Sequence, residues 1–370
     1  MKIGIIGTRG IPNQYGGFEQ FTEFIAPALV ERGHEVLVYN SSLHPYKESS
    51  WKAVRLIHCY DPEDRLGTAG QFIYDFNCIR NSRRWGLDII LQLGYTSSSI
   101  WSFLFPKNSL LVTNMDGLEW KRTKYSMPVR YFLKNAEKWA ARYSDLLIAD
   151  SIGIQDYLQR SYQKSSRFIP YGAVLFDKPD ETRVTDLGLE PFGYNLMIAR
   201  MEPENNIETV MLGYADARSP KPLILIGNYG NRFGQYLRNK FASDRIRFWG
   251  PQYDIALLNQ LRHFSNIYFH GHSVGGTNPS LLEAMASQCL IVAHDNVFNH
   301  AVLGAEGMYF SYPADISSLL HADIEKSTFQ HFIALNNQKV RELYAWDHIT
   351  DLLENFLLEA LQSAGRQSRS

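Results

Sequence analysis

A glycine-containing loop before a helix start is the stretch of this sequence best suited to hold an anion. The loop contains Gly275 and Gly276, and Asn278 and Pro279 follow them. Glycine lets a backbone approach a ligand closely, Asn is a preferred helix cap, and Pro suits a first helical turn. An apolar run at 267–270 predicts a strand just before the loop. The N–H groups and dipole of the predicted helix start favour an anion such as a diphosphate, and Thr277 and Ser280 complete this candidate site.

Two charged side chains are the candidates for chemistry beside this loop. Glu283 falls about one turn into the predicted helix, near enough to accept hydrogen bonds from sugar hydroxyls. Arg200 ends another predicted strand just before a helix, where a guanidinium is placed for bidentate contact with a phosphate. The alternative interpretation is an ordinary strand-to-helix turn with a surface glutamate and a surface arginine.

Two further turns in the second half are donor-side candidates. Gly227 follows a predicted strand and allows close approach of the backbone. Tyr253 ends the stretch 248–253, which could hold a flat base by stacking. Core packing of these aromatic residues is the alternative.

A second glycine loop follows the first predicted strand. Gly16 and Gly17 precede a predicted helix there, and we interpret them as donor-binding residues that approach a phosphate or a sugar. The alternative is that they only form the turn. Three glycines within residues 4–10 have a dinucleotide-like spacing, but such a site needs an acidic residue after the second strand, where this sequence has Asn40. A nicotinamide-dependent enzyme is therefore disfavoured.

Polar and aromatic residues after a later strand of the first half are candidates for binding an acceptor. Asp116 and Glu119 could bind hydroxyls, and Trp120 could stack on a sugar ring. Ligands of open α/β sheets bind outside the carboxyl ends of the strands, where this segment lies. Equally, Asp116 could only cap a turn.

Basic residues recur every four positions along the next predicted helix, 128–143. They are Arg130, Lys134, Lys138 and Arg142. Two interpretations stay open for this stripe: a solvated face, or a face that rests on an anionic membrane surface.

The composition narrows the class of protein. A hydrophobic content of 45% and a charged content of 20% are ordinary for a globular protein, and the net charge of -1 argues against general nucleic-acid binding. The three cysteines have no paired spacing, which indicates reduced thiols in a cytoplasmic protein and neither disulfides nor a metal site. No apolar run reaches the length of a membrane span.

Strand-like runs alternate with helical patterns throughout the chain, and the runs are apolar on both alternating faces. This pattern predicts the α/β class with buried parallel sheets. A chain of 370 residues is long enough for two domains. We expect Rossmann-like domains at 1–172 and 173–345 that face each other across a cleft, a helix at 346–362 that packs back on the first domain, and a disordered tail at 363–370.

These residues together resemble the retaining GT-B glycosyltransferases of the large bacterial family that includes mannosyl- and sucrose-forming enzymes. The resemblance runs from Met1 to about Leu358. It rests on Gly16-Gly17-Phe18-Glu19 with Glu31-Arg32-Gly33-His34-Glu35-Val36, on Ala199-Arg200 with Pro203-Glu204-Asn205-Asn206, and on Gly275 to Glu283. More narrowly, Gly7-Thr8-Arg9-Gly10-Ile11-Pro12 with Tyr15-Gly16-Gly17-Phe18-Glu19, and Gly275-Gly276-Thr277-Asn278-Pro279-Ser280, resemble the rhamnosyltransferase branch.

The resemblance implies a function. The implied reaction is metal-independent transfer of a sugar with retention, in which Arg200 and Glu283 are catalytic. The donor would be dTDP-L-rhamnose or another nucleotide sugar, and the acceptor a saccharide or lipid-linked saccharide of capsule or O-antigen synthesis. The protein would then be cytoplasmic, at the cytoplasmic face of the inner membrane if the basic stripe binds lipid.

Two departures from the family pattern keep other functions open. The family's first glutamate is Gly275 here, and the lysine of its diphosphate clamp is Asn205. A smaller residue facing the sugar would fit a 6-deoxy sugar. The alternatives are a hexosyltransferase that uses a UDP- or GDP-sugar, and a catalytically weakened protein that only binds sugar nucleotides.

Overall fold

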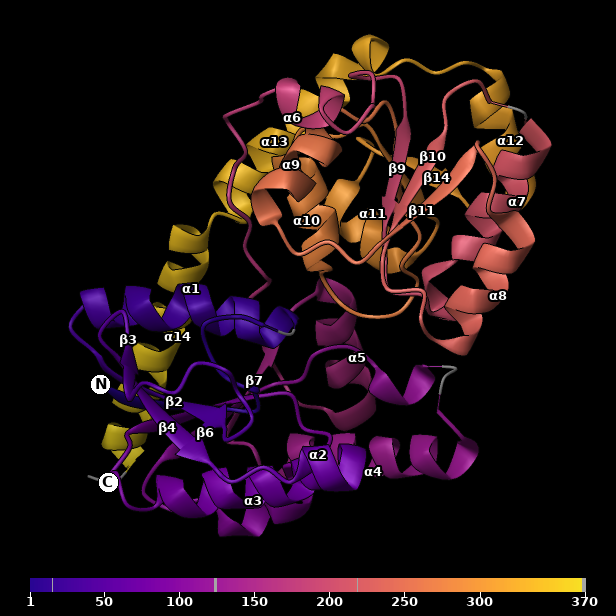
Figure 1. Cartoon of the computed structure of the whole chain (residues 1–370). Coiled ribbons are helices and arrows are strands. Elements are labelled where there is room, and N and C mark those ends of the chain that lie inside the picture. The colour runs from indigo at the N-terminus through magenta and orange to yellow at the C-terminus, as the bar shows by residue number, and fades with distance from the viewer. Residues whose placement is uncertain (15, 123–124, 218, 368–370) are drawn as a thin grey trace. The chain divides into compact units, whose positions relative to one another are not determined.

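A computed structural model of the chain describes residues 1–14, 16–122, 125–217 and 219–367, without the side chains of 366 and 367. The described residues form two compact units (Figure 1). The first takes those within Met1–Trp120, Met127–Tyr171 and Trp346–Ser370, and the second takes those within Lys121–Ser126 and Gly172–Ala345. Each unit has its own sheet and apolar core.

The sheet of the first unit is parallel except at one edge. Its described strands are β1 (Lys2–Ile6), β2 (Glu35–Ser41), β3 (Ser50–Trp51), β4 (Val54–Cys59), β5 (Ile89–Leu93), β6 (Leu110–Asn114), β7 (Leu146–Ala149) and β8 (Arg167–Phe168). They lie in the order β3-β4-β2-β1-β5-β6-β7-β8, and only the β3–β4 pair is antiparallel among them. Ile3 lies opposite Val36 on one side and Ile89 on the other. β5 is buried at every residue because helices cover both faces.

Helices cover this sheet on both faces, with α1 and α14 on one face and α3 on the other (Figure 1). The helices of the first unit are α1 (Gly17–Glu31), α2 (Glu63–Leu66), η1 (Gly67–Ala69), α3 (Gly70–Ser82), η2 (Ser99–Leu104), α4 (Met127–Tyr143), α5 (Ile152–Tyr162) and α14 (Trp346–Gln367). The short helix η3 (Glu119–Lys121) crosses the boundary between the two units. Leu133, Ala136 and Ala140 are buried on one face of α4, as the helical period predicts.

The last helix packs within the first unit. The ring of Trp346 stacks on Phe24 of α1 with centroids 4.5 Å apart, and Arg32 Nη1 pairs with Glu354 Oε2 at 2.7 Å. α14 continues to Gln367, beyond the predicted end at 362. The Ser363 hydroxyl donates to the carbonyl of Glu359 in this extra turn, so the polar residues continue the helix. Of the predicted disordered tail 363–370, residues 363–367 are therefore helical, and 368–370 lie outside the described residues.

The sheet of the second unit is fully parallel in its described part. Its strands are β9 (Asn195–Ile198), β10 (Leu223–Ile226), β11 (Ile246–Gly250), β12 (Tyr268–His270), β13 (Ile291–His294) and β14 (Met308–Phe310), in the order β11-β10-β9-β12-β13-β14. Its helices are α6 (Thr182–Thr185), η4 (Pro203–Asn205), α7 (Ile207–Ala217), α8 (Arg232–Phe241), α9 (Ile255–His263), α10 (Pro279–Ala286), α11 (Val297–Leu303), α12 (Pro313–His321), η5 (Lys326–Phe329) and α13 (Gln330–Leu343). In Figure 1, α7, α8 and α12 lie on one side of this sheet, and α9, α10 and α13 lie on the other.

The predicted α/β class with two parallel, Rossmann-like sheets is confirmed. The short strands β3, β8 and β14 were not predicted, since two or three residues are too few to show a period. Both sheets have a switch point where the order of the chain reverses. It lies between β1 and β5 in the first unit and between β9 and β12 in the second. Ligands of such sheets bind outside the carboxyl ends of the strands at this point.

Candidate functional site

The switch point of the second sheet brings together two of the predicted segments. Arg200 follows β9, and the glycine loop follows β12, the strand that pairs with β9. The two loops are joined directly, because the backbone N–H and hydroxyl of Ser273 donate to the carbonyl of Glu204 at 3.1 and 2.7 Å. The side chain of Asn206 donates to the carbonyl of Gly271 at 2.8 Å. The exposed Arg200 therefore lies on a loop fastened to the glycine loop.

Asn205 shapes the turn that carries Arg200. Its amide donates to the carbonyl of Arg200 at 2.7 Å, and the side chain is buried at 6% exposure. In this structure the amide of Asn205 is directed at the backbone and fixes the turn that carries Arg200.

The first turn of α10 is closed by its own cap. The Asn278 side chain accepts a hydrogen bond from the Ser280 amide at 2.9 Å, and Pro279 has no N–H. The amides of Leu281 and Leu282 donate to the Asn278 carbonyl. The prediction of open amides in this turn is therefore wrong: the capping side chain that starts the helix also satisfies its first donor.

The preceding loop has the amide donors that this turn lacks. Among the described residues, the N–H groups of Gly275 and Gly276 have no acceptor in the protein. Gly275 has a φ of +127°, a conformation that favours glycine. Thr277, also predicted at this site, is buried at 3% exposure. The Ser280 hydroxyl is engaged with the Tyr268 hydroxyl at 2.8 Å. The amides of Gly275 and Gly276 and the helix dipole would favour an anion at this loop.

Glu283 is held by a buried cation. Its Oε2 accepts from Nη2 of Arg262 at 2.5 Å, and Arg262 is only 3% exposed. Arg262 also donates to Asn259 Oδ1 at 3.0 Å. The carboxylate of Glu283 is 29% exposed, so it is a fixed acceptor with a guanidinium behind it. Sequence reasoning missed Arg262, which lies on α9 and shows no motif.

Gly227 and Tyr253, the other two donor-side candidates of the second unit, lie in different surroundings. A Cβ on Gly227 would lie 2.1 Å from the Ala199 carbonyl oxygen, so this glycine permits close packing beside the end of β9. Tyr253 is 80% exposed, which excludes the alternative of core packing for this ring.

A small pocket lies at the glycine loop. It is lined by His272, Ser273, Val274, Gly275, Gly276, Asn278, Phe298 and Asn299. Phe298 and Asn299 of α11 were not predicted. They follow the carboxyl end of β13, so the rule that located the other loops would also have found them.

In the first unit, Glu19 holds the loop between β1 and α1, which ends at Gly16. The Arg9 amide donates to Glu19 Oε1 at 2.7 Å, and Glu19 is 5% exposed. Burial raises the pKa of Glu19, and the hydrogen bond from the Arg9 backbone opposes that shift. Gly16 is the N-cap of α1, and a Cβ on Gly17 would lie 3.3 Å from the Tyr171 hydroxyl. Both glycines are therefore at a tight helix entrance.

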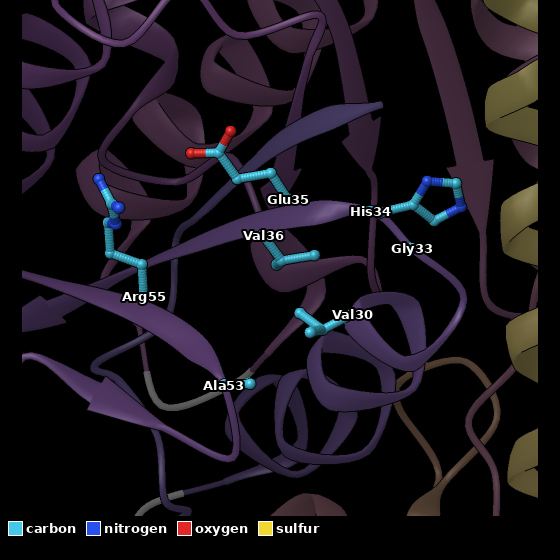
Figure 2. A pocket seen from close by; sticks show the side chains of 7 residues that line it. All are labelled: Val30, Gly33, His34, Glu35, Val36, Ala53 and Arg55. Atoms are coloured by element: carbon cyan, nitrogen blue, oxygen red, sulfur yellow. The ribbon is translucent and has the colours of Figure 1, made fainter.

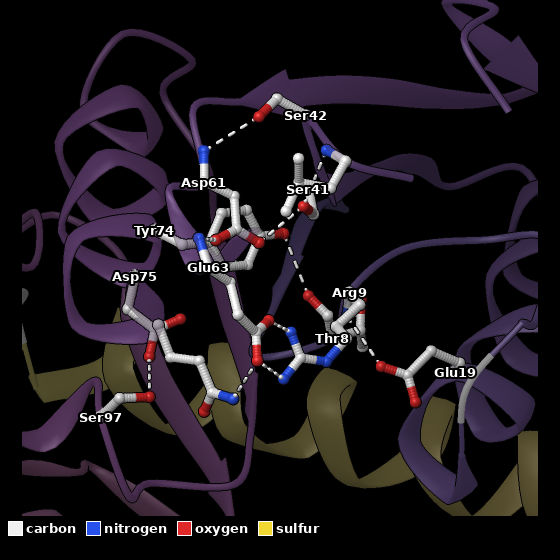
Figure 3. Close-up of polar contacts among 12 residues, drawn as sticks. Thr8, Arg9, Glu19, Ser41, Ser42, Asp61, Glu63, Tyr74, Asp75 and Ser97 are labelled. Atoms are coloured by element: carbon white, nitrogen blue, oxygen red, sulfur yellow. Dashed lines mark hydrogen bonds and ion pairs between the residues drawn. The ribbon is translucent and has the colours of Figure 1, made fainter. Parts of the chain in front are cut away.

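A polar network that sequence reasoning missed joins the carboxyl ends of β1, β2, β4 and β5 (Figure 3). The Arg9 guanidinium makes a two-point contact with the Glu63 carboxylate. Asp61 accepts from the Ser41 hydroxyl at 2.6 Å. Asp75 accepts from the Ser97 hydroxyl at 2.5 Å, and burial raises the pKa of Asp75 to about 7. The one sequence signal for this cluster is that several of these residues come shortly after strands.

Trp120, a predicted acceptor residue, is anchored at its indole. Its Nε1 donates to Glu137 Oε2 at 3.0 Å, and Lys134 Nζ lies 4.4 Å from the centre of its ring. Glu137 is 1% exposed and also accepts from Lys134, Tyr157 and Tyr162. One face of the Trp120 ring is therefore already covered.

The neighbouring predicted acceptor residues lie on the same loop. Asp116 has a φ of +47°, and its amide donates to Asn114 Oδ1 at 3.1 Å, so the strained turn after β6 is fixed by Asn114. Glu119 begins η3. Asp116, Glu119 and Trp120 thus lie between β6 and α4, and their binding of an acceptor stays a prediction.

The basic stripe of α4 divides in two. Arg130 donates to the Trp120 carbonyl at 2.8 Å, and Lys134 is turned into the Glu137 cluster. Lys138 and Arg142 are exposed. The prediction of one continuous basic face is therefore wrong, because a buried carboxylate draws Lys134 inward.

A further pocket lies at the amino ends of β2 and β4 (Figure 2). It is lined by Val30, Gly33, His34, Glu35, Val36, Ala53 and Arg55. Nε2 of His34 is hydrogen-bonded to Oε1 of Glu354 at 2.6 Å. The pocket is at the opposite end of the strands from the polar network, so we do not assign the site to it.

No group of three or more His, Cys, Asp or Glu residues in the described part of the chain is arranged to hold a metal ion. Within the described residues, every helix falls short of the length or the apolar character that crossing a bilayer requires.

Comparisons with known proteins place this geometry in a known fold. Residues 1–174 match the family described as "Domain of unknown function (DUF1972)". A search of curated proteins finds no match. Solved structures similar over nearly the whole chain include sucrose-phosphate synthase (tll1590) from Thermosynechococcus elongatus, with 18% identity, a TM-score of 0.78 and coverage of 98% of this chain and 99% of that one.

Two further structures are also similar over nearly the whole chain. Anabaena Alr3699/HepE in complex with UDP and glucose has 18% identity, a TM-score of 0.72 and coverage of 97% of this chain and 100% of that one. The structure "Trehalose-6-phosphate from E. coli bound with UDP-2-fluoro glucose" has 11% identity, a TM-score of 0.71 and coverage of 96% of this chain and 99% of that one. These similarities show that the chain has the GT-B glycosyltransferase fold.

Proposed function

We propose that this protein transfers a sugar from a nucleotide sugar to a hydroxyl of a saccharide acceptor. The observation that carries the proposal is the joining of the Arg200 loop to the glycine loop at the switch point of the second sheet. A guanidinium and two glycine amides on fastened loops can receive a diphosphate. The neighbours Alr3699/HepE and the E. coli protein were solved with UDP and UDP-sugar ligands, which supports the same ligand class here.

The chemistry follows from these groups. Transfer from a nucleotide sugar breaks the bond between the anomeric carbon and the diphosphate, so negative charge develops on the leaving phosphate. Arg200 and the amides of Gly275 and Gly276 would stabilise that charge. Glu283, held in place by Arg262, would accept hydrogen bonds from donor hydroxyls. The reaction would retain the anomeric configuration, and the departing phosphate would accept the proton of the acceptor hydroxyl.

We propose that the second unit binds the donor and the first unit binds the acceptor. On the acceptor side, Asp116, Glu119 and the anchored Trp120 are supported by their shared loop. Gly16 and Gly17 mark a tight helix entrance at the switch point of the first sheet.

The preferred donor is dTDP-L-rhamnose, and the preferred acceptor is a lipid-linked saccharide of capsule or O-antigen synthesis. Gly275 supports a 6-deoxy sugar, because this position has no side chain that could hydrogen-bond a 6-hydroxyl. UDP-glucose is the second candidate, supported by the ligands of the neighbours.

Separate reactions with dTDP-L-rhamnose, UDP-glucose and GDP-mannose, each with a lipid-linked glycoside, test the proposal. Mass spectrometry should show extension by one sugar with one donor, and the coupling constants of the product should show retention. Extension with UDP-glucose alone would replace the rhamnose assignment. Tight binding of donors without extension of any acceptor would favour the binding protein.

We also propose that the exposed part of α4 contacts an anionic membrane. Lys138 and Arg142 are exposed there, and Tyr131 is exposed at 75%. Sedimentation with vesicles that contain phosphatidylglycerol should fall when Lys138 and Arg142 are changed to glutamine. Equal sedimentation of both proteins would contradict the contact.

A further inference from the structure

Two histidines stack at the carboxyl end of β12. The ring centroids of His270 and His272 are 4.5 Å apart with an interplanar angle of 17°. His270 is 1% exposed. Neither ring nitrogen of His270, nor Nδ1 of His272, has a hydrogen-bond partner among the described protein atoms. Buried polar groups are nearly always hydrogen-bonded, so packing alone does not account for this pair.

Only one histidine of the pair lines the pocket at the glycine loop, and that is His272. The other polar side chains of the pocket are committed to backbone groups. Ser273 donates to the Glu204 carbonyl, Asn278 caps α10, and Asn299 donates to the carbonyls of His272 and His294. Among the described lining residues, the imidazole of His272 is therefore the polar side chain that remains for a ligand.

The backbone of His272 is also held firmly. Its carbonyl accepts from the side chains of Asn296 and Asn299, both at 3.1 Å. The stack on His270 and the hydrogen bonds to this carbonyl both restrict the position of the ring. A ring fixed in this way can orient a ligand without losing conformational freedom on binding.

The charge state of this ring points to the kind of ligand group. Burial, followed by the positive charges of Arg200 and Arg122, lowers the pKa of His272 to about 3. At neutral pH the ring is uncharged and offers one donor and one acceptor. A sugar hydroxyl also offers one donor and can accept, so the two groups are matched. An anionic phosphate would instead be bound by Arg200 and the amides of Gly275 and Gly276, which offer a positive charge and hydrogen-bond donors.

We infer that His272 recognises the sugar of the nucleotide sugar, with its imidazole exchanging a hydrogen bond with one sugar hydroxyl. His270 stacks on this ring and does not itself line the pocket. This inference rests on the proposed function, because it requires that the second unit bind a nucleotide sugar.

The sharpest test is His272→Phe, which keeps a flat ring to stack on His270 and removes both nitrogens. Calorimetry should be done on the full chain with UDP-glucose against UDP, and with dTDP-L-rhamnose against dTDP. We expect the Kd of the bound nucleotide sugar to rise about tenfold, a typical effect of one lost hydrogen bond. The Kd of the matching nucleoside diphosphate should change less than twofold. His272→Gln should recover part of the loss, since its amide can both donate and accept.

His270→Phe is the matched control, because it changes the other ring of the same stack and does not touch the pocket. Its Kd for the nucleotide sugar should stay within twofold of the wild type. An equal loss in His270→Phe and His272→Phe would overturn the inference, and so would equal weakening of UDP and UDP-glucose or no weakening of either. If the wild type binds none of the four compounds, the proposed function fails as well. If the wild type binds them and His272→Phe binds the nucleotide sugar with the same Kd, only the role of His272 fails.

Discussion

The side-chain amide of Asn205 donates a hydrogen bond to the backbone carbonyl of Arg200 across 2.7 Å. This contact closes the turn after β9 and sets the direction in which Arg200 leaves the sheet. Asn205 stands where the family pattern has a lysine. It therefore contacts the backbone of Arg200 and supplies no second positive charge.

The first prediction concerns this pair. Arg200→Ala should lower turnover more than tenfold, or over ~1.4 kcal/mol of transition-state stabilisation, because the charge on the leaving diphosphate loses its counter-ion. Asn205→Ala should lower kcat/KM by a smaller factor. If Asn205 acts through Arg200, the double variant should be no slower than Arg200→Ala alone, which steady-state kinetics of the four proteins would show. Fully additive losses would mean that Asn205 contacts the ligand independently.

The second prediction concerns the ion pair of Glu283 with Arg262. Glu283→Gln should lower the free energy of unfolding by about 3 kcal/mol, because it leaves a buried guanidinium without its anion. It should also weaken nucleotide-sugar binding. Adding Arg262→Met should recover most of the stability and none of the affinity, as measured by urea unfolding and calorimetry. Recovery of affinity along with stability would make Glu283 purely structural.

Two glycines should respond differently to a methyl group. Gly227→Ala should be the more destabilising change, because its Cβ would lie 2.1 Å from the Ala199 carbonyl oxygen. Gly275→Ala should cost only about 1–2 kcal/mol, the strain of a side chain at positive φ, because its Cβ meets nothing within 4 Å. Thermal unfolding of both variants would check the order. The reverse order would contradict the described packing beside β9.

The buried carboxyl of Asp75 should make the free energy of unfolding depend on pH. Burial raises the pKa of its carboxyl from 3.8 to about 7 in the folded state. Between these values the unfolded chain has lost the proton and the folded chain keeps it, so stability falls as pH rises, by ~1.4 kcal/mol per pH unit. From pH 5 to 8 this single group should therefore remove about 3 kcal/mol.

The matched variant for that dependence is Asp75→Asn, which can still accept a hydrogen bond from Ser97. Urea unfolding at pH 5 and pH 8 should show a smaller loss of stability in the variant, by about 3 kcal/mol. The same loss in both proteins would place the pH dependence on other groups.

The elements that carry the site could be predicted from local sequence. Strands apolar on both faces predicted parallel sheets, and the cap at Asn278 with Pro279 predicted the start of α10. These signals depend on neighbours within a few residues, so the sequence shows them directly. The rule that ligands bind beyond the carboxyl ends of strands then placed Arg200 and the glycine loop at candidate sites.

The sequence by itself therefore determined the class of fold and which loops face the ligand edge of each sheet. Only the tertiary structure decided the partners: Arg262 behind Glu283, Glu137 drawing Lys134 inward, Glu63 holding Arg9, and His270 beneath His272. Except for the Lys134–Glu137 and His270–His272 pairs, these partners lie on elements that are separate along the chain. The reason is physical: periodicity records which face of an element is buried, whereas the partner of a charge depends on which distant side chain the packing brings within hydrogen-bonding distance.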